Sequence, residues 1–331
     1  MRILVLGGTE FVGRALVLDA LGRGHEVTTL NRGGNADADG AVTALRGDRR
    51  EPGGLDALRG GAWDVVVDTW SREPYVVHDS VRALKGQVGR YLFVSTRSVY
   101  QYPTPAGADE GAPLTEGDPE AGRDGSEVPY PEAKRGAEIA IEQTFGDEHV
   151  HARAGLILGP WENIGRLPWW LGRLARGGDV LAPGPQDLPL QYIDARDLAA
   201  WTIGAAEQGL SGPYDLISPP GHTTMGEFLR IGAEVTGSRA TLRWAAPDQL
   251  EDVAAWMELP VWIPPGPDHA GMHLSDPSKA LATGLVNRPV RETVADTWAW
   301  LQSIGGEAPQ RSDRPRLGLD PAKEAQILAR L

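Results

Sequence analysis

Tyr130 and Lys134, two side chains able to exchange a proton, lie four residues apart in the sequence. Pro131 favours a helix that begins there, and the spacing places both side chains on one helix face. A nearby ammonium group stabilises a phenolate, so it lowers a tyrosine pKa that is ordinarily about 10. The pair could therefore donate or accept a proton near neutral pH, whereas a solvated pair on a surface helix is the structural alternative.

Only four of the 32 basic residues are lysines, which makes the choice of lysine at position 134 informative. A compact ammonium can bond two ribose hydroxyls where the fork of an arginine fits poorly. Thr96 follows Ser95 at the end of a predicted strand, and its hydroxyl could meet that of Tyr130. The hydroxyls of Ser95, Thr96 and Ser98 could equally cap loop amides.

The chain begins with an element suited to holding a nucleotide. The apolar run from Ile3 predicts a strand covered by helices on both faces, and Gly7 and Gly8 follow it. Paired glycines let main-chain N–H groups face a pyrophosphate at the N-terminus of a helix that starts near Phe11. Gly13 would let that helix lie close to the sheet. Such turns also occur for purely structural reasons, but the position after a buried strand favours nucleotide binding.

Strand and helix patterns then alternate, which predicts an α/β fold with a doubly wound, parallel-sheet Rossmann domain. Strands are predicted at 25–30, 41–46, 63–68, 90–95, 149–158 and 191–194, and helices at 55–58, 74–84, 131–145, 195–201 and 320–331. The predicted division is a Rossmann domain over 1–158 and 189–217, a smaller, discontinuous C-terminal substrate domain over 159–188 and 218–305, and a tail helix within 306–331.

Two further segments have unusual compositions. Residues 101–129 are rich in Pro, Gly and acidic residues and lack periodicity, so we expect either disorder or a functional loop such as a lid. Nine of the 11 tryptophans follow Pro160, which predicts an aromatic-lined pocket. Core packing or a subunit interface is the alternative.

The overall composition narrows the class of protein. The formal charge is −13, which disfavours a nucleic acid partner. Cysteine is absent, and neither a signal peptide nor a membrane span is evident, so we expect a cytoplasmic location without disulfides. We predict no metal site, because Asp268, His269 and His273 lie among Pro and Gly residues, and His149 and His151 alternate as strand-surface residues would.

Four motifs together resemble the extended, epimerase/dehydratase-like branch of the short-chain dehydrogenase/reductase family. They are Gly7-Gly8-Thr9-Glu10-Phe11-Val12-Gly13, Ser95-Thr96-Arg97-Ser98-Val99-Tyr100, Tyr130-Pro131-Glu132-Ala133-Lys134, and residues 153–160. The resemblance implies that Tyr130 transfers a proton, that Lys134 holds the nicotinamide ribose and biases Tyr130, and that Thr96 bonds the substrate oxygen. Related enzymes often form dimers, so we expect a homodimer.

The second predicted strand ends in Asn31 and Arg32, where an NAD enzyme of this type usually presents an acid. A guanidinium suits a 2′-phosphate, so we expect NADP in preference to NAD. Asp48 resembles an adenine-contacting aspartate of the family, with a turn residue as the alternative. The predicted cofactor contacts are Gly7, Gly8, Thr9, Phe11, Val12, Gly13, Asn31, Arg32, Asp48, Asp68, Thr69, Ser95, Tyr130 and Lys134.

Three departures from the family pattern bear on the reaction. Glu10 occupies a position that is commonly glycine, and its carboxylate would disfavour a pyrophosphate unless it points away or meets a cation such as Arg14 or Arg32. Arg97 and Ser98 replace the Asp-Glu pair of sugar-nucleotide dehydratases. Leu190 replaces an arginine common in members that bind nucleotide diphosphate sugars.

These residues predict an NAD(P)-dependent oxidoreductase that acts on a carbonyl/alcohol pair of a small, uncharged or aromatic metabolite. One alternative is a sugar epimerase that holds its cofactor tightly, and another is a non-catalytic cofactor-binding or RNA-associated relative. The residues suggested for the substrate wall, each with core packing as its alternative, are Trp70, Ser98, Trp161, Trp169, Gln191 and Trp262.

Overall fold

The computed structural model describes residues 1–33, 40–311 and 314–331. A parallel seven-stranded sheet forms the centre of the N-terminal half, in the order β11-β6-β5-β4-β1-β2-β3. Its strands are β1 (Arg2–Leu6), β2 (Glu26–Asn31), β3 (Val42–Arg46), β4 (Trp63–Asp68), β5 (Val88–Thr96), β6 (His149–Ala154) and β11 (Gly212–Leu216). The strand order reverses between β1 and β4, the place where ligands bind in such sheets.

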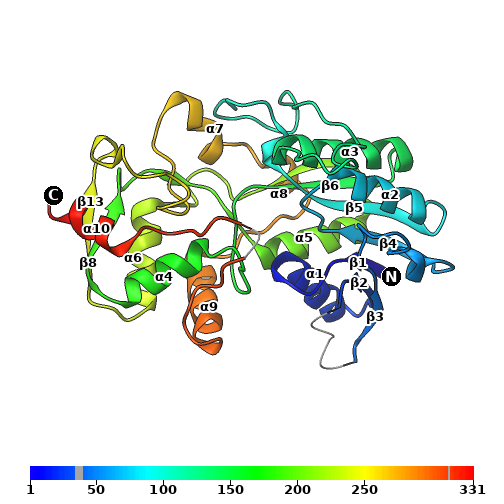
Figure 1. Ribbon diagram of the computed structural model, residues 1–331, viewed down its shortest axis with the longest axis horizontal. Helices are drawn as coiled ribbons and strands as arrows, with labels where there is room; N and C mark the ends of the chain where they lie inside the picture. Colours follow the sequence, from blue (N-terminus) through cyan, green and yellow to red (C-terminus); the bar gives the residue numbers. More distant parts are fainter. Residues whose placement is uncertain (34–39, 312–313) are drawn as a thin grey trace.

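Helices cover both faces of this sheet, as the apolar strands require. Helices α1 (Phe11–Gly22) and α5 (Ala195–Gln208) pack together on one face, and α2 (Pro74–Leu84) and α3 (Tyr130–Phe145) pack together on the other (Figure 1). Each face has its own apolar core cluster. The predicted α/β doubly wound fold is therefore confirmed.

The C-terminal half has a third apolar cluster, which includes the fully buried Trp170. A two-stranded parallel sheet of β8 (Gly178–Pro183) and β13 (Ala240–Ala245) lies at the far end from the large sheet (Figure 1). The other elements are β7 (Ile157–Leu158), β9 (Pro189–Leu190), β10 (Ile193–Asp194), β12 (Thr223–Thr224), α4 (Arg166–Ala175), α6 (Met225–Val235), α7 (Ala270–His273), α8 (Ser278–Ala282), α9 (Val290–Ser303) and α10 (Pro321–Leu328), with short 3₁₀ turns η1 (Asp56–Leu58), η2 (Arg97–Val99), η3 (Pro247–Leu250) and η4 (Pro267–His269).

The predicted final helix is α10, and Asp320 caps it by accepting bonds from the N–H groups of Ala322 and Lys323. Glu324 of α10 forms a buried ion pair with Arg173 of α4 at 2.7 Å. Because a buried pair satisfies both charges only in this position, it fixes α10 against the C-terminal half. Among the described residues, no helix has the length and apolar character needed to cross a membrane.

Two sequence-based expectations need adjustment. The predicted strand 149–158 divides at Gly155, where a Cβ would lie 2.4 Å from Ile217, and its end pairs with β10 instead of continuing in the large sheet. The 101–129 segment contains no helix, but its first part is fixed by main-chain bonds: the N–H groups of Gly271 and Asp276 donate to the carbonyls of Thr104 and Ala108, at 3.0 Å each. The segment therefore joins the two halves of the chain. The predicted domain boundaries remain an interpretation.

Candidate active site

The turn after β1 has the backbone that its glycines allow. Gly7 and Gly8 have φ values of +115° and +101°, and a Cβ on Gly13 would lie 2.6 Å from the Gly8 nitrogen. Glu10, at the N-cap of α1, makes no side-chain bond to the first N–H groups of the helix. The turn thus offers uncapped main-chain donors at the positive end of a helix, an arrangement that fits a dinucleotide pyrophosphate.

Glu10 interacts with residues other than Arg14 and Arg32, the cations that the sequence suggested. Its carboxylate accepts a hydrogen bond from the Asn163 side chain at 2.6 Å, and it interacts electrostatically with Arg311 of the C-terminal tail. Arg14 instead lies over the Trp161 ring, with 5.2 Å between the guanidinium carbon and the ring centroid. Residues 161–163 therefore lie against the dinucleotide turn, from the other half of the chain.

Tyr130 and Thr96 meet at the carboxyl edge of the sheet, as the sequence suggested. Thr96 ends β5 and Tyr130 begins α3, and the hydrogen-bonding interaction between their hydroxyls lowers the pKa of Tyr130. Desolvation of the phenol outweighs this effect and raises that pKa, although Tyr130 as a residue is 43% exposed. The expected lowering of the Tyr130 pKa is therefore wrong for the protein alone, and the cations that act on the phenol are Arg166 and Arg314.

Lys134 lies one turn further along α3 and is almost fully buried. Its ammonium donates to the main-chain carbonyls of Trp70 and Val94, at 2.6 and 2.7 Å, and lies 3.9 Å from the Phe93 ring centroid. Burial lowers the pKa of Lys134 to about 7, against the opposing influence of Asp68 and Glu138. Two of its three N–H donors are thus used by the strand ends, which leaves one for a ribose hydroxyl.

Two predicted cofactor contacts have their polar groups satisfied inside the protein. The Asp68 carboxylate is fully buried and accepts two bonds from Arg49 at 2.7 Å and one from the Tyr91 hydroxyl at 2.6 Å. The Ser95 hydroxyl donates to Glu138 at 2.7 Å. Asp68 and Ser95 therefore shape the strand ends through buried bonds, and only their main chains are left to meet a ligand.

Arg32 follows β2 and is exposed, and its main-chain carbonyl accepts a bond from Arg46 at 3.2 Å. The hydrogen bonds and charge of Arg50 lower the pKa of Asp48, and the charge of Arg32 adds a smaller effect in the same direction. The Asn31 amide oxygen accepts the N–H of Gly33 at 3.0 Å. This strand end thus carries more cationic than anionic groups among the described residues.

Thr69 supports the glycine turn, because its hydroxyl donates to the Leu6 carbonyl at 3.0 Å and occupies the space beside Gly7.

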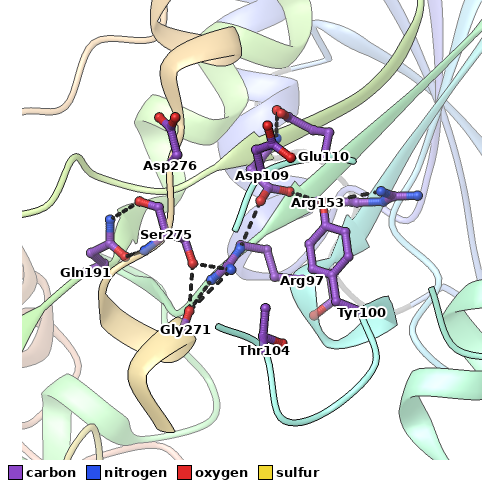
Figure 2. Close-up of polar contacts among 12 residues, drawn as sticks. Arg97, Tyr100, Thr104, Asp109, Glu110, Arg153, Gln191, Gly271, Ser275 and Asp276 are labelled. Atoms are coloured by element: carbon purple, nitrogen blue, oxygen red, sulfur yellow. Dashed lines mark hydrogen bonds and ion pairs between the residues drawn. The ribbon is translucent and has the colours of Figure 1, made fainter. Parts of the chain in front are cut away.

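Arg97, which replaces a dehydratase acid, is used within the protein. Figure 2 shows its guanidinium directed toward Ser275 and the Gly271 carbonyl, and it also pairs with the fully buried Asp215 at 3.1 Å. Burial raises the pKa of Asp215 to about 6, while Arg97 and the Tyr100 hydroxyl oppose the rise. Arg97 therefore joins β5, β11 and the α7 region and has no group free for acid-base work.

The structure corrects two of the suggested substrate residues. The Gln191 carboxamide is buried and bonds to the main chain of Ser218 and Ser275, at 2.7 to 3.0 Å. Trp262 is 2% exposed, and its indole donates to the Gly184 carbonyl. Both side chains belong to the core, and their polar atoms have hydrogen-bond partners within the protein. Residue type alone could not distinguish this role from a substrate contact.

The other four suggested substrate residues differ in the contacts that they make. Trp161 packs under Arg14, while Ser98 bonds to Thr96, and both stay candidates. The Trp70 indole donates to the Glu73 carbonyl at 2.9 Å. Trp169 packs against Trp170. Its indole also lies so close to Gly318 of the C-terminal tail that a Cβ on that glycine would clash with it.

The histidines also differ from expectation. His151 is fully buried and contacts Glu142 at 3.2 Å, so it is not a strand-surface residue. Glu142, His149 and His151 lie close enough to hold a metal ion, but Arg135 already pairs with the same Glu142 oxygen at 2.8 Å. His273 is buried, and its Nδ1 accepts the N–H of Gln191, at 3.2 Å.

One cluster was missed by sequence reasoning. Arg166 begins α4, and its guanidinium carbon lies 5.1 Å from the centroid of the Trp256 ring. Glu162 is buried and accepts the main-chain N–H groups of Arg166 and Leu167, at 2.6 and 3.2 Å. An arginine four residues after a glutamate looks like a solvated helix pair in the sequence, so only the fold distinguishes it.

The chain is similar in sequence to known proteins. The 2-alkyl-3-oxoalkanoate reductase of Stenotrophomonas maltophilia is 29% identical over 227 residues, which cover 60% of this chain and 64% of that protein. The chloroplast stem-loop binding protein of 41 kDa b from Arabidopsis thaliana is 32% identical over 114 residues, 30% of each chain. This chain thus spans less than two thirds of the length of either relative.

Among solved structures, the UDP-glucose 4-epimerase of Thermus thermophilus in complex with NAD is similar in fold. Its TM-score is 0.63 at 22% identity, and the match covers 90% of this chain and 99% of that one. Residues 3–215 match the model of the NAD dependent epimerase/dehydratase family. They include the glycine turn, Thr96, Tyr130 and Lys134. With more than half of its length matched, the chain belongs to the NAD-dependent epimerase/dehydratase family of enzymes.

Proposed function

We propose that this protein is an NAD(P)-dependent oxidoreductase that interconverts a carbonyl and an alcohol on a small metabolite. The single observation that carries the proposal is the meeting of the Thr96 and Tyr130 hydroxyls beside a glycine turn whose helix donors are uncapped. Such an edge brings together a proton-transfer group and a place for a dinucleotide.

Within this proposal, the chain's residues divide the work. Thr96 donates a hydrogen bond to the substrate oxygen, and Tyr130 takes the proton of an alcohol or returns it to a carbonyl. Lys134 would hold the nicotinamide ribose through its remaining N–H donor, while the glycine turn would hold the pyrophosphate. When bound, the nicotinamide supplies or accepts the hydride.

For the cofactor we propose NADP in preference to NAD. The support is the exposed Arg32 at the end of β2, with Arg46 bonded to its carbonyl and no acid at positions 31–33 to receive a ribose 2′-hydroxyl. Guanidinium groups bind phosphate through charge-assisted bonds. The protein would work in the cytoplasm on a small molecule, without nucleic acid, and a homodimer stays a prediction.

The second candidate function is epimerisation of a sugar, which the family includes. Leu190 counts against a nucleotide-sugar substrate, because it stands where related enzymes carry a cation. Arg97 counts against dehydration of such a sugar, because it replaces an acid and is bound to Asp215. Net change in the absorbance of reduced nicotinamide during turnover supports a dehydrogenase. Isomerisation without net change supports an epimerase. An RNA-associated role is disfavoured by the charge of −13.

The deciding experiment compares Tyr130→Phe with the unaltered protein on a panel of alcohols and ketones. Loss of the proton donor should reduce turnover by about 10²-fold or more, while cofactor affinity stays the same. Tyr102→Phe is a matched control, because Tyr102 is also exposed but bonds only to His269 among the described residues. Equal turnover in the Tyr130→Phe variant would remove Tyr130 from the mechanism.

A further inference from the structure

The half-buried Arg166 guanidinium differs from those of Arg49, Arg97 and Arg153 because it lacks an ion pair among the described residues. Its Nε atom is buried and has no hydrogen-bond partner there. An unsatisfied buried donor costs free energy, and a charged one costs more. The guanidinium is therefore in the condition expected of a group that awaits a ligand.

Arg166 is also held in position. Its guanidinium lies against the Trp256 indole, and the backbone of Trp256 is held by a bond from its N–H to the Trp262 carbonyl at 2.9 Å. A stacked guanidinium keeps its edge free for two parallel bonds to a carboxylate or phosphate. The arrangement thus prepares the geometry before a ligand arrives, which reduces the entropic cost of binding.

The place of Arg166 beside Tyr130 follows from its neighbours. Asn163 bonds to Glu10 of the dinucleotide turn at 2.6 Å, so the segment that leads into α4 lies over the carboxyl edge of the sheet. Arg166 and Tyr130 influence each other electrostatically. Arg314 of the tail acts on both groups, which adds a second positive charge near the phenol.

Among the described residues, Glu162 is the acid that acts on Arg166, and it compensates little of this charge. Glu162 uses its carboxylate oxygens to accept the N–H groups at the start of α4. Burial raises the pKa of Glu162 to about 7, so near neutral pH a large fraction of this group is uncharged. Among the described residues, the charges that act on Tyr130 are therefore positive, although the protein as a whole is acidic.

From this geometry we infer that Arg166, supported by Trp256, binds an anionic group, a carboxylate or a phosphate, on the part of the substrate that faces Tyr130. The inference rests on the proposed function and deepens it: the substrate is an anionic metabolite, not the uncharged one that the sequence suggested. Its reactive oxygen would meet Thr96 and Tyr130 while its anion meets Arg166.

The test titrates acetate, malonate and inorganic phosphate into the full-length protein with bound NADPH and follows nicotinamide fluorescence. At least one anion should bind saturably, and Arg166→Gln should weaken that binding by about tenfold or more, since a charge-assisted bond is lost. Arg166→Lys should retain part of it. Arg243→Gln is the matched control, because Arg243 is an exposed arginine paired with Asp179 at the far sheet.

The anion that binds more tightly distinguishes a carboxylate from a phosphate substrate. Binding that is equal in the unaltered protein and in Arg166→Gln, or no binding of any of the three anions, overturns the inference. Failure of the proposed function is a separate result, in which NADPH and NADH do not bind. In that case calorimetry with the same anions and the protein alone still decides whether Arg166 forms an anion site.

Discussion

Two arginine clusters lie on the substrate side of the sheet and differ in how completely their charges are met. Arg97 pairs with Asp215 and bonds to Gly271 and Ser275, so every part of its guanidinium has a protein partner nearby (Figure 2). Arg166 lies against Trp256 and has a buried nitrogen without a partner in the described part of the chain. The difference teaches that a satisfied buried charge fixes the structure, while an unsatisfied one indicates a binding role.

The largest expected effect is on stability, at the satisfied cluster. Arg97→Met should lower the free energy of unfolding by about 3–5 kcal/mol near pH 8, because the buried Asp215 carboxylate loses its cation. Urea denaturation measures the change. The double variant Arg97→Met with Asp215→Asn should lose clearly less, since no charge is left uncompensated. A change below about 1 kcal/mol in the single variant would contradict the structural role of Arg97.

At Arg166 we expect a small effect on stability and a larger effect on activity. Arg166→Met should change the free energy of unfolding by about 1 kcal/mol or less, because it removes a donor that has no hydrogen-bond partner among the described residues. Turnover over KM should fall by about tenfold or more if the substrate is anionic. The same two measurements on both variants provide the comparison. A large loss of stability in Arg166→Met would place Arg166 with Arg97 as a structural residue.

Glu162 allows a pH test of the second cluster. Its pKa is raised by burial to about 7 from an ordinary 4.5, so between these values the folded protein holds a proton that the unfolded chain has released. Its contribution to stability is therefore complete below about pH 4.5 and is lost as the pH rises through about 7. Glu162→Gln should remove this pH dependence, worth about 2–3 kcal/mol, in unfolding measured from about pH 5 to 8. An unchanged profile would show that Glu162 titrates normally.

A smaller effect is expected at the exposed Arg32, which extends the comparison to a charge in solvent. Arg32→Gln should raise the KM for NADPH relative to that for NADH by about threefold to tenfold, because one contact to a 2′-phosphate is lost in a well-solvated place. Stability should not change. Arg59→Gln is the control, since Arg59 is also exposed and pairs only with Asp56 among the described residues. If the ratio of the KM for NADPH to that for NADH is the same in Arg32→Gln and Arg59→Gln, Arg32 does not select NADP.

The sequence predicted the large sheet well because its strands obey local rules. The strand 63–68 and the helix 74–84 have the predicted ends, and the turn at Gly7 and Gly8 lies where an apolar run stops. The approach of Tyr130 to Thr96 was also predictable, since carboxyl ends of parallel strands share one edge of a sheet.

The sequence could not assign residues whose role depends on distant partners. Gln191 looks like a substrate contact until Ser218 and Ser275 take up its carboxamide. Asp68 looks like a strand-end ligand until Arg49, 19 residues earlier, pairs with it. Arg166 gave no local indication of function, because the buried nitrogen that distinguishes it, unpartnered within the described residues, is a property of the folded chain.

The bonds that join the two halves of the chain are spread over several places, and this has a mechanical consequence. Arg97 connects the halves through bonds to Gly271 and Ser275 and is itself fixed by Asp215. At α5, Arg196 and Asp197 pair with Asp296 and Arg288. A rotation of one half against the other would have to break charged contacts at both places. The two halves are therefore expected to keep a fixed orientation.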